Sequence, residues 1–213
     1  MRTYVFIDAS NLFYGGRKSL GWDIDHEKLL AYLKNRYQAT EIYYFGGAEI
    51  YNFPFNYIEC NTVPLKKVCD YLVNYLQENS SRLNDLDTLL INKYLKKVRF
   101  YMKIESFGYK LILKPIKTYI GDNGVEQRKA NCDVDMTFLI MKYRDDFDRV
   151  TVVSGDGDFL PVLKYLKDIG KEVLVLSNSL RTAKEIKLFA GDKFLDFEFL
   201  REIIKVDDKN LEK

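Results

Sequence analysis

The chain has 213 residues, of which 47% are hydrophobic and 30% are charged, with a formal net charge of +2 at pH 7. This length supports one sizeable core, and so small a net charge points by itself to no class of partner. Three cysteines without a CxxC pair argue against a disulfide framework and against a structural zinc site.

Features of the whole sequence favour a cytoplasmic protein. The N-terminus passes directly into a strand-like run without a long apolar segment, so we expect no targeting signal. No stretch approaches the roughly 18 uncharged apolar residues of a membrane helix, so we expect no membrane association. The oligomeric state is not fixed by the sequence, and a homodimer is one option.

In chain order, the first half of the sequence predicts three strands and three helices. The apolar runs at 4–7, 41–47 and 109–115 are typical of strands. Asp25 is a natural N-cap for a helix at 26–37, and helical spacing of apolar residues between 64 and 107 indicates two more helices.

The second half predicts a regular alternation. Asn123 and Gly124 favour the tip of a hairpin or loop. After this tip we expect strands at 150–153, 171–177 and 193–197 and helices at 134–145, 159–169, 180–190 and 198–204. Gly170 is expected to end the helix that precedes it.

Strands that alternate with helices predict an α/β fold, a three-layer sandwich with a central, mainly parallel sheet and helices on both faces. We expect one domain over residues 1–204, with a helical, basic middle segment at about 63–107 and a charged tail at 205–213. Such sheets carry their sites at the carboxyl ends of the strands. If the strands that precede Asp8 and Asp156 are neighbours, their carboxylates meet at one edge.

Three acidic clusters lie near predicted strand or helix ends. Asp8 ends the first strand, Asp156 and Asp158 follow the run at 150–153, and Asp133 and Asp135 flank the start of a helix. Two carboxylates about 4 Å apart repel by roughly 4 kcal/mol at an effective dielectric near 20, so a shared site needs a cation or altered protonation. Such hard oxygen ligands suit Mg²⁺ or Mn²⁺.

Each acid also has an ordinary structural explanation. Asp8 and Asp158 are well placed to cap a helix, and Asp133 or Asp135 favours a helix dipole. Gly155 and Gly157 can supply unusual turn dihedrals without any ligand. A shared metal site is the more specific hypothesis, because all three clusters occur in one parallel-sheet chain.

Several blocks of the sequence resemble the NYN domain family of PIN-like, metal-dependent ribonucleases. "FIDASNLFY" is similar to the first block, "KANCDVDM" to the second, and "VVSGDGDFLPVLKYLKDIGKEVLV" to the third and most distinctive one. "LRTAKEIKLFAGDKFLDF" is similar to the closing segment, so the resemblance runs from about residue 3 to 200.

The resemblance implies hydrolysis of phosphodiester bonds in RNA with Mg²⁺ or Mn²⁺ as cofactor. The matching catalytic positions are Asp8, Asn11, Asp133, Asp156 and Asp158. All of the aspartates would bind metal, with Asp135 as a further candidate, and Asn11 would orient the substrate or a ligand. Many relatives carry another aspartate inside the helix after the second block, whereas "MTFLIMKY" has none.

A basic tract lies between Lys93 and Lys117, where Glu105 is the only acid. We expect RNA, most simply single-stranded, to contact this tract and the basic pair that follows it. The candidate RNA-binding residues are Lys96, Lys97, Arg99, Lys103, Arg128 and Lys129. Bases could stack on the interleaved aromatics Tyr94, Tyr101, Phe107, Tyr109 and Tyr119. The plain alternative is a helix with aromatics in the core and lysines in water.

Two alternatives to a ribonuclease remain open on the sequence. One is a non-catalytic RNA-binding regulator on the same fold. The other is a haloacid-dehalogenase-like phosphatase, because "SGDGD" resembles a late acidic motif of those enzymes. They need Asp-x-Asp on the first strand, whereas Ser10 stands two positions after Asp8.

Overall fold

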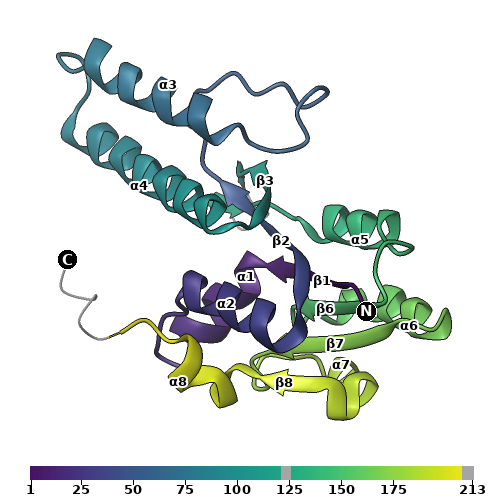
Figure 1. The fold of residues 1–213 in the computed structure, drawn as a ribbon. Coiled ribbons are helices and arrows are strands. Elements are labelled where there is room, and N and C mark those ends of the chain that lie inside the picture. The colour runs from purple at the N-terminus through teal and green to yellow at the C-terminus, as the bar shows by residue number, and fades with distance from the viewer. Residues whose placement is uncertain (121–125, 208–213) are drawn as a thin grey trace. The chain divides into compact units, whose positions relative to one another are not determined.

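The computed structural model describes residues 1–120 and 126–207, without the side chains at 17, 118–120 and 126–129. The predicted hairpin tip at Asn123 and Gly124 and most of the predicted tail lie outside the described residues. Figure 1 shows the course of the chain. The three cysteines are free, as expected.

The strands and helices follow the predicted alternation. The strands are β1 (Thr3–Asp8), β2 (Ala39–Ala48), β3 (Lys110–Pro115), β4 (Lys117–Ile120), β5 (Glu126–Lys129), β6 (Arg149–Val153), β7 (Glu172–Ser177) and β8 (Phe194–Asp196). The α-helices are α1 (Ala9–Phe13), α2 (His26–Tyr37), α3 (Leu65–Glu78), α4 (Asp85–Phe107), α5 (Asp133–Lys142), α6 (Leu160–Asp168), α7 (Lys184–Ala190) and α8 (Arg201–Ile204). A π-helix at Tyr14–Lys18 and 3-10 turns at Gly157–Phe159, Gly191–Lys193 and Phe197–Leu200 complete the elements.

Several predicted helix boundaries were wrong, one of them for a clear local reason. The helix expected from residue 180 starts at Lys184. The side-chain oxygen of Asn178 accepts a hydrogen bond from the backbone N–H of Leu180, and the backbone carbonyl of Asn178 accepts one from the backbone N–H of Arg181. These bonds hold a turn in place of a first helical turn. The helix expected to reach residue 145 ends at Lys142.

The chain divides into two compact units. Unit 1 comprises Met1–Phe45 and Asp133–Lys213, and unit 2 comprises Gly46–Cys132. Unit 2 holds the contacting helices α3 and α4, strand β3 and the antiparallel ribbon β4–β5. The expectation of one domain over residues 1–204 therefore stays a prediction.

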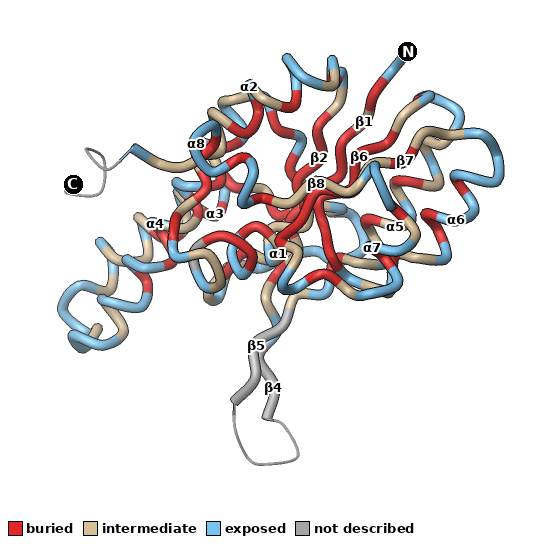
Figure 2. The backbone as a smooth tube through the Cα atoms, turned by 90° about the horizontal axis from the view of Figure 1, so that it is seen from below, coloured by how far each residue is buried: buried red, intermediate tan, exposed pale blue. Residues whose placement is uncertain are grey.

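The central sheet has the strand order β3-β2-β1-β6-β7-β8. The ladders β1–β2, β1–β6, β6–β7 and β7–β8 are all parallel, which confirms the predicted parallel sheet. From the centre, the chain crosses through α2 in one direction and through α6 and α7 in the other. Since such crossovers are right-handed, the helices must cover opposite faces. Figure 2 shows α2 and α8 on one side of the strands and α6 and α7 on the other.

Burial explains why these segments form a core. Val5, Phe6 and Ile7 in β1 are fully buried, as expected for a parallel strand covered on both faces. Phe6 stacks on Tyr43 with ring centroids 5.2 Å apart, which joins β1 to β2. Among the described residues, no helix has both the length and the apolar character that crossing a membrane requires.

Candidate functional site

Strand register brings three polar residues to one level at the carboxyl edge of the sheet. Ile7 of β1 is opposite Val153 of β6, so the next residues, Asp8 and Ser154, end neighbouring strands together. The ladder between β6 and β7 places Ser177 beside them. Strand order reverses between β1 and β6, and open α/β sheets bind ligands at such a point.

Asp8 caps α1 and carries a perturbed carboxyl group. Its Oδ1 accepts a hydrogen bond from the backbone N–H of Ser10 at 2.8 Å, so its predicted capping role is real. Burial raises the pKa of Asp8 above its ordinary value, and the negative charge of Asp133 adds to the rise against the opposing backbone hydrogen bond from Ser10. Asp8 and Asp133 therefore lie within electrostatic reach of each other.

Helix α5 supplies the second acidic cluster. Asp133 and Asp135 both lie in its first turn, as predicted, and both are half-buried. The helix contacts β1 and the 3-10 turn that follows β6. It is therefore the element that brings the second block of acids to the ends of these two strands.

The third cluster lies in the loop after β6. Asp156 caps the 3-10 turn, because its Oδ1 accepts a hydrogen bond from the N–H of Asp158 at 2.9 Å. We had expected Asp158 to be the cap, and the structure assigns that role to Asp156. Both residues are exposed, so their carboxylates face solvent at the edge where β1 also ends.

Space requires a glycine at Gly155 in this loop. An added Cβ at Gly155 would lie 2.7 Å from both Ser177 Oγ and Thr182 Oγ1 and 2.9 Å from the Thr182 Cα. At Gly157 it would lie 2.6 Å from Glu185 Oε1, which is the end of a flexible side chain. Neither glycine has a positive φ, which corrects the expectation that they supply unusual turn dihedrals. The close approach lets the end of β6 pack against the loop after β7.

Asn11 is held by a residue that the sequence did not single out. The Ser177 hydroxyl donates a hydrogen bond of 2.9 Å to Asn11 Oδ1, and Ser177 is fully buried. This bond fixes the amide of Asn11 on α1, directly after Asp8. The only signal in the sequence was a pair of small polar residues, Ser177 and Asn178, at the end of an apolar strand.

The donor chemistry of this edge fits a hard divalent cation. Asp8 and Asp133 offer half-buried carboxylate oxygens that disfavour each other, and Asp156 and Asp158 offer exposed ones. Within residues 1–120 and 126–207, no three acidic, histidine or cysteine side chains form a ready-made ligand group. Mg²⁺ keeps several waters and usually takes one or two protein carboxylates, which this edge can provide.

The predicted RNA-binding residues lie in unit 2. Lys96, Arg99 and Lys103 are exposed on α4. Lys97 instead forms an ion pair of 3.1 Å with Glu49, which is only 9% exposed. The side chains of Arg128 and Lys129, on β5, lie outside the described residues.

Three of the tyrosines between these lysines are buried. Tyr94, Tyr101 and Tyr109 are all buried, and the Tyr101 hydroxyl donates a hydrogen bond of 2.8 Å to the carbonyl of Gly47. The expectation of base stacking was wrong for these three residues, which are core aromatics. Phe107 is half-buried, and Phe100 on the same helix is exposed. The side chain of Tyr119 lies outside the described residues.

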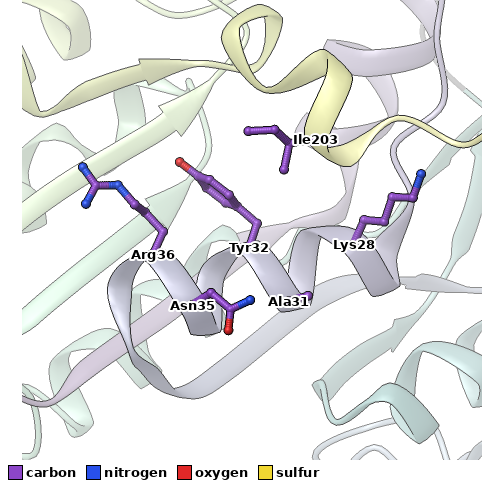
Figure 3. A pocket seen from close by; sticks show the side chains of 6 residues that line it. All are labelled: Lys28, Ala31, Tyr32, Asn35, Arg36 and Ile203. Carbon is purple, nitrogen blue, oxygen red and sulfur yellow. The ribbon is translucent and has the colours of Figure 1, made fainter.

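A separate hollow in unit 1 has no acidic lining. An open groove of about 490 Å³ lies along α2 and is lined by Lys28, Ala31, Tyr32, Asn35, Arg36 and Ile203. Figure 3 shows Tyr32 and Ile203 on facing sides of this groove. The lining of the groove has no carboxylate to bind a metal ion, so the acidic edge is the better candidate site.

Comparisons with known proteins identify the family of the chain. A model of the NYN domain family matches residues 2–198. The low amplitude and bright protein LabA of Synechococcus elongatus is 21% identical over 212 residues, which cover 98% of this chain and 90% of that protein. A protein of unknown function from Vibrio parahaemolyticus has a similar crystal structure, with a TM-score of 0.59, 18% identity and 96% of each chain covered.

Proposed function

Because the chain belongs to the NYN domain family, within the PIN-like nuclease superfamily, we propose that it is a metal-dependent ribonuclease that cleaves single-stranded RNA. One observation carries the proposal: helix α5, which has Asp133 in its first turn, contacts β1, and β1 ends at the half-buried Asp8 where strand order reverses. Uncompensated like charges at that point favour a bound cation.

Four carboxylates are the proposed metal ligands. Asp8 and Asp133 would hold Mg²⁺ or Mn²⁺, with Asp156 and Asp158 contributing from the loop after β6 and Asp135 as a further ligand. The bound cation would lower the pKa of a water and offset charge on the phosphate. The bound cation would stabilise the ionised form of Asp8 against the burial that raises its pKa.

The chain's own residues divide the remaining tasks. Asn11 has its Oδ1 occupied by Ser177, so its amide N–H₂ group is left to donate toward a substrate oxygen. We propose that Lys96, Lys97, Arg99 and Lys103, with Arg128 and Lys129, contribute electrostatic attraction for RNA. Such contacts would bind phosphates without reading bases.

A cleavage assay tests the enzyme. A fluorogenic single-stranded RNA is incubated with wild-type protein and with Asp156→Asn, in Mn²⁺ and in excess chelator. Wild type should cleave only with the metal, and Asp156→Asn, which keeps a capping side chain, should lose at least about 100-fold of that rate. Asp146→Asn, at an exposed aspartate in the turn after α5, is the matched control and should cleave like wild type.

Thermal melting supplies an independent readout. Millimolar Mn²⁺ should raise the melting temperature of the wild-type protein by mass action, and Asp156→Asn should reduce that shift. Equal cleavage in all samples would indicate a contaminating nuclease, and together with an unshifted melt it would refute the proposal.

One observation favours a second candidate, a non-catalytic RNA-binding regulator. Beyond Asp135, helix α5 carries no further carboxylate, and no three-carboxylate group exists among the described residues. A regulator would bind RNA in the same samples and show no metal-dependent cleavage. The family match gives no support to the haloacid-dehalogenase-like alternative.

A further inference from the structure

Two large aromatic side chains are exposed beside the acidic edge. Phe13 ends α1 and is 48% exposed, and Tyr14 follows it and is 43% exposed. Their rings meet edge to face, with centroids 5.3 Å apart. Both belong to the segment that begins at Asp8, and Phe13 lies about 7 Å further along the helix axis, at roughly 1.5 Å per residue.

Two cations lie against these rings. The Lys18 ammonium is 5.8 Å from the ring centroid of Phe13 and 5.3 Å from that of Tyr14, and the Arg181 guanidinium is 5.3 Å from that of Tyr14. Lys18 and Arg181 are exposed, and neither forms an ion pair with any carboxylate in the described part of the chain. Their charge is therefore available to an anion from outside the protein.

Asn178 fixes this group relative to the acidic edge. Its side-chain amide donates a hydrogen bond of 2.8 Å to the backbone carbonyl of Gly15, and its backbone carbonyl accepts one from the backbone N–H of Arg181. Asn178 is buried and directly follows Ser177, which binds Asn11. The segment with Tyr14 and the loop with Arg181 are thus joined at the residue next to the candidate site.

We propose that Phe13, Tyr14, Lys18 and Arg181 form a binding subsite for single-stranded nucleic acid, the aromatic–basic subsite. A base stacks on the exposed aromatic surface, and the two cations bind the flanking phosphates. The subsite rests on the proposed function, because it would hold the strand next to the carboxylates that act on it. Every base has a π-face, so the subsite would be tolerant of sequence.

The chemistry favours nucleic acid over a simple anion. A phosphate alone would use the two cations and would leave the aromatic surface in water. A single strand presents an aromatic face and a negative charge at every nucleotide, which matches both halves of the subsite. A cation–aromatic cluster with a purely structural role would stabilise the fold and would not contribute to base-dependent binding.

Equilibrium binding of labelled RNA tests the subsite. Fluorescence anisotropy is measured with Ca²⁺ in place of Mn²⁺, and gels confirm that the strand stays intact. Phe13→Ala should weaken binding by about 10-fold, the scale of losing one base–aromatic stack. Tyr14→Phe keeps the ring and should bind like wild type. Arg181→Ala should lower the slope of log affinity against log salt by about 0.7 for a lost phosphate contact.

Matched controls come from the same unit. Phe199→Ala removes an aromatic that is 79% exposed in the last 3-10 turn, and Lys167→Ala removes a cation that lies 5.2 Å from the ring of Phe189. Neither change should alter RNA affinity. Melting temperatures close to that of wild type show that each variant is folded.

An abasic strand of equal length separates stacking from charge. Phe13→Ala should leave the affinity for the abasic strand unchanged, while Arg181→Ala weakens both strands. The subsite is refuted if Phe13→Ala binds the base-containing RNA like wild type, even when Mn²⁺-dependent cleavage is intact. Aromatic-dependent binding without any cleavage would support the subsite and refute the ribonuclease.

Discussion

The two basic regions of this protein differ in what their cations contact. Helix α4 carries the densest run of lysines in the sequence, yet Lys97 is paired with Glu49 and the tyrosines between the lysines are buried. The aromatic–basic subsite has only Lys18 and Arg181, but both lie on exposed rings. The density of lysines along a chain therefore says little about where aromatic and cationic groups face solvent together.

The comparison separates two kinds of proposed contact with RNA. Exposed lysines on α4 can attract a polyanion without distinguishing a base from its absence. The aromatic–basic subsite and the acidic edge lie in unit 1, where loops after β1, β6 and β7 are joined by hydrogen bonds. Substitutions at these sites in unit 1 should alter the rate of RNA cleavage or the stacking of bases. Substitutions on α4 should alter only the electrostatic attraction for RNA or the stability of the protein.

The largest effect is expected for Asp8→Asn. Asparagine keeps the N-cap of α1 but removes a proposed metal ligand, so the rate of Mn²⁺-dependent RNA cleavage should fall by at least about 100-fold. Initial rates at saturating RNA measure this, with Asp146→Asn as the control. If Asp8→Asn cleaves RNA like wild type, Asp8 has no role in cleavage. The contrast between unit 1 and α4 would then be weaker.

A smaller effect is expected for Lys97→Met. Glu49 is buried and would lose a charged partner at 3.1 Å, so the free energy of unfolding should fall by about 2 kcal/mol. Urea titration measures the loss. The double variant Glu49→Gln with Lys97→Met should recover most of it, and Lys96→Met, on the exposed face, should change stability by less than about 0.5 kcal/mol. Equal losses for both lysines would show that Lys97 has no special role.

Protonation of Asp8 gives a third, pH-dependent effect. Folding raises the pKa of Asp8, so its ionised form destabilises the metal-free protein at neutral pH. Asp8→Asn should therefore stabilise that protein and raise its melting temperature. The gain should be full above the raised pKa and should vanish as pH falls below the ordinary value of 3.8. Melting curves across this range, without metal, test the sign.

The smallest effect is expected for single lysines on α4. Lys96→Ala and Lys103→Ala should each lower the salt slope of RNA binding by about 0.7, with only a few-fold loss of affinity. Base-containing and abasic strands should respond equally, in contrast to Phe13→Ala. A loss restricted to the base-containing strand would mean that α4 also stacks bases, and the comparison would fail.

Much of the fold could be predicted from local pattern. Short apolar runs and helical spacing located every strand of the central sheet, because burial on both faces leaves a clear signal. The short helix α1 at Ala9–Phe13 was not predicted. The acidic edge followed from topology, since Asp8 and Asp156 end parallel strands. Tyr94 and Tyr101 are seven residues apart on one helix, so their burial on a shared face could also have been predicted.

The positioning contacts could not be predicted, because they join residues far apart in sequence. Ser177 and Asn11 are separated by 166 positions, and small polar residues at a strand end look like ordinary turn formers. The contact of Arg181 with Tyr14 is likewise non-local. The choice between Asp156 and Asp158 as the cap depends on where the 3-10 turn starts. Sequence patterns do not fix the first residue of a helix or turn.

The pairing of β1 with β6 has a consequence for biosynthesis. The first strand emerges from the ribosome early, but Ile7 must wait for Val153 before the two strands can form their ladder. Domains complete their folding only when all their strands are available. The proposed nuclease would therefore stay inactive while it is translated from its own messenger RNA. Its proposed active site would form only after most of the polypeptide has been made.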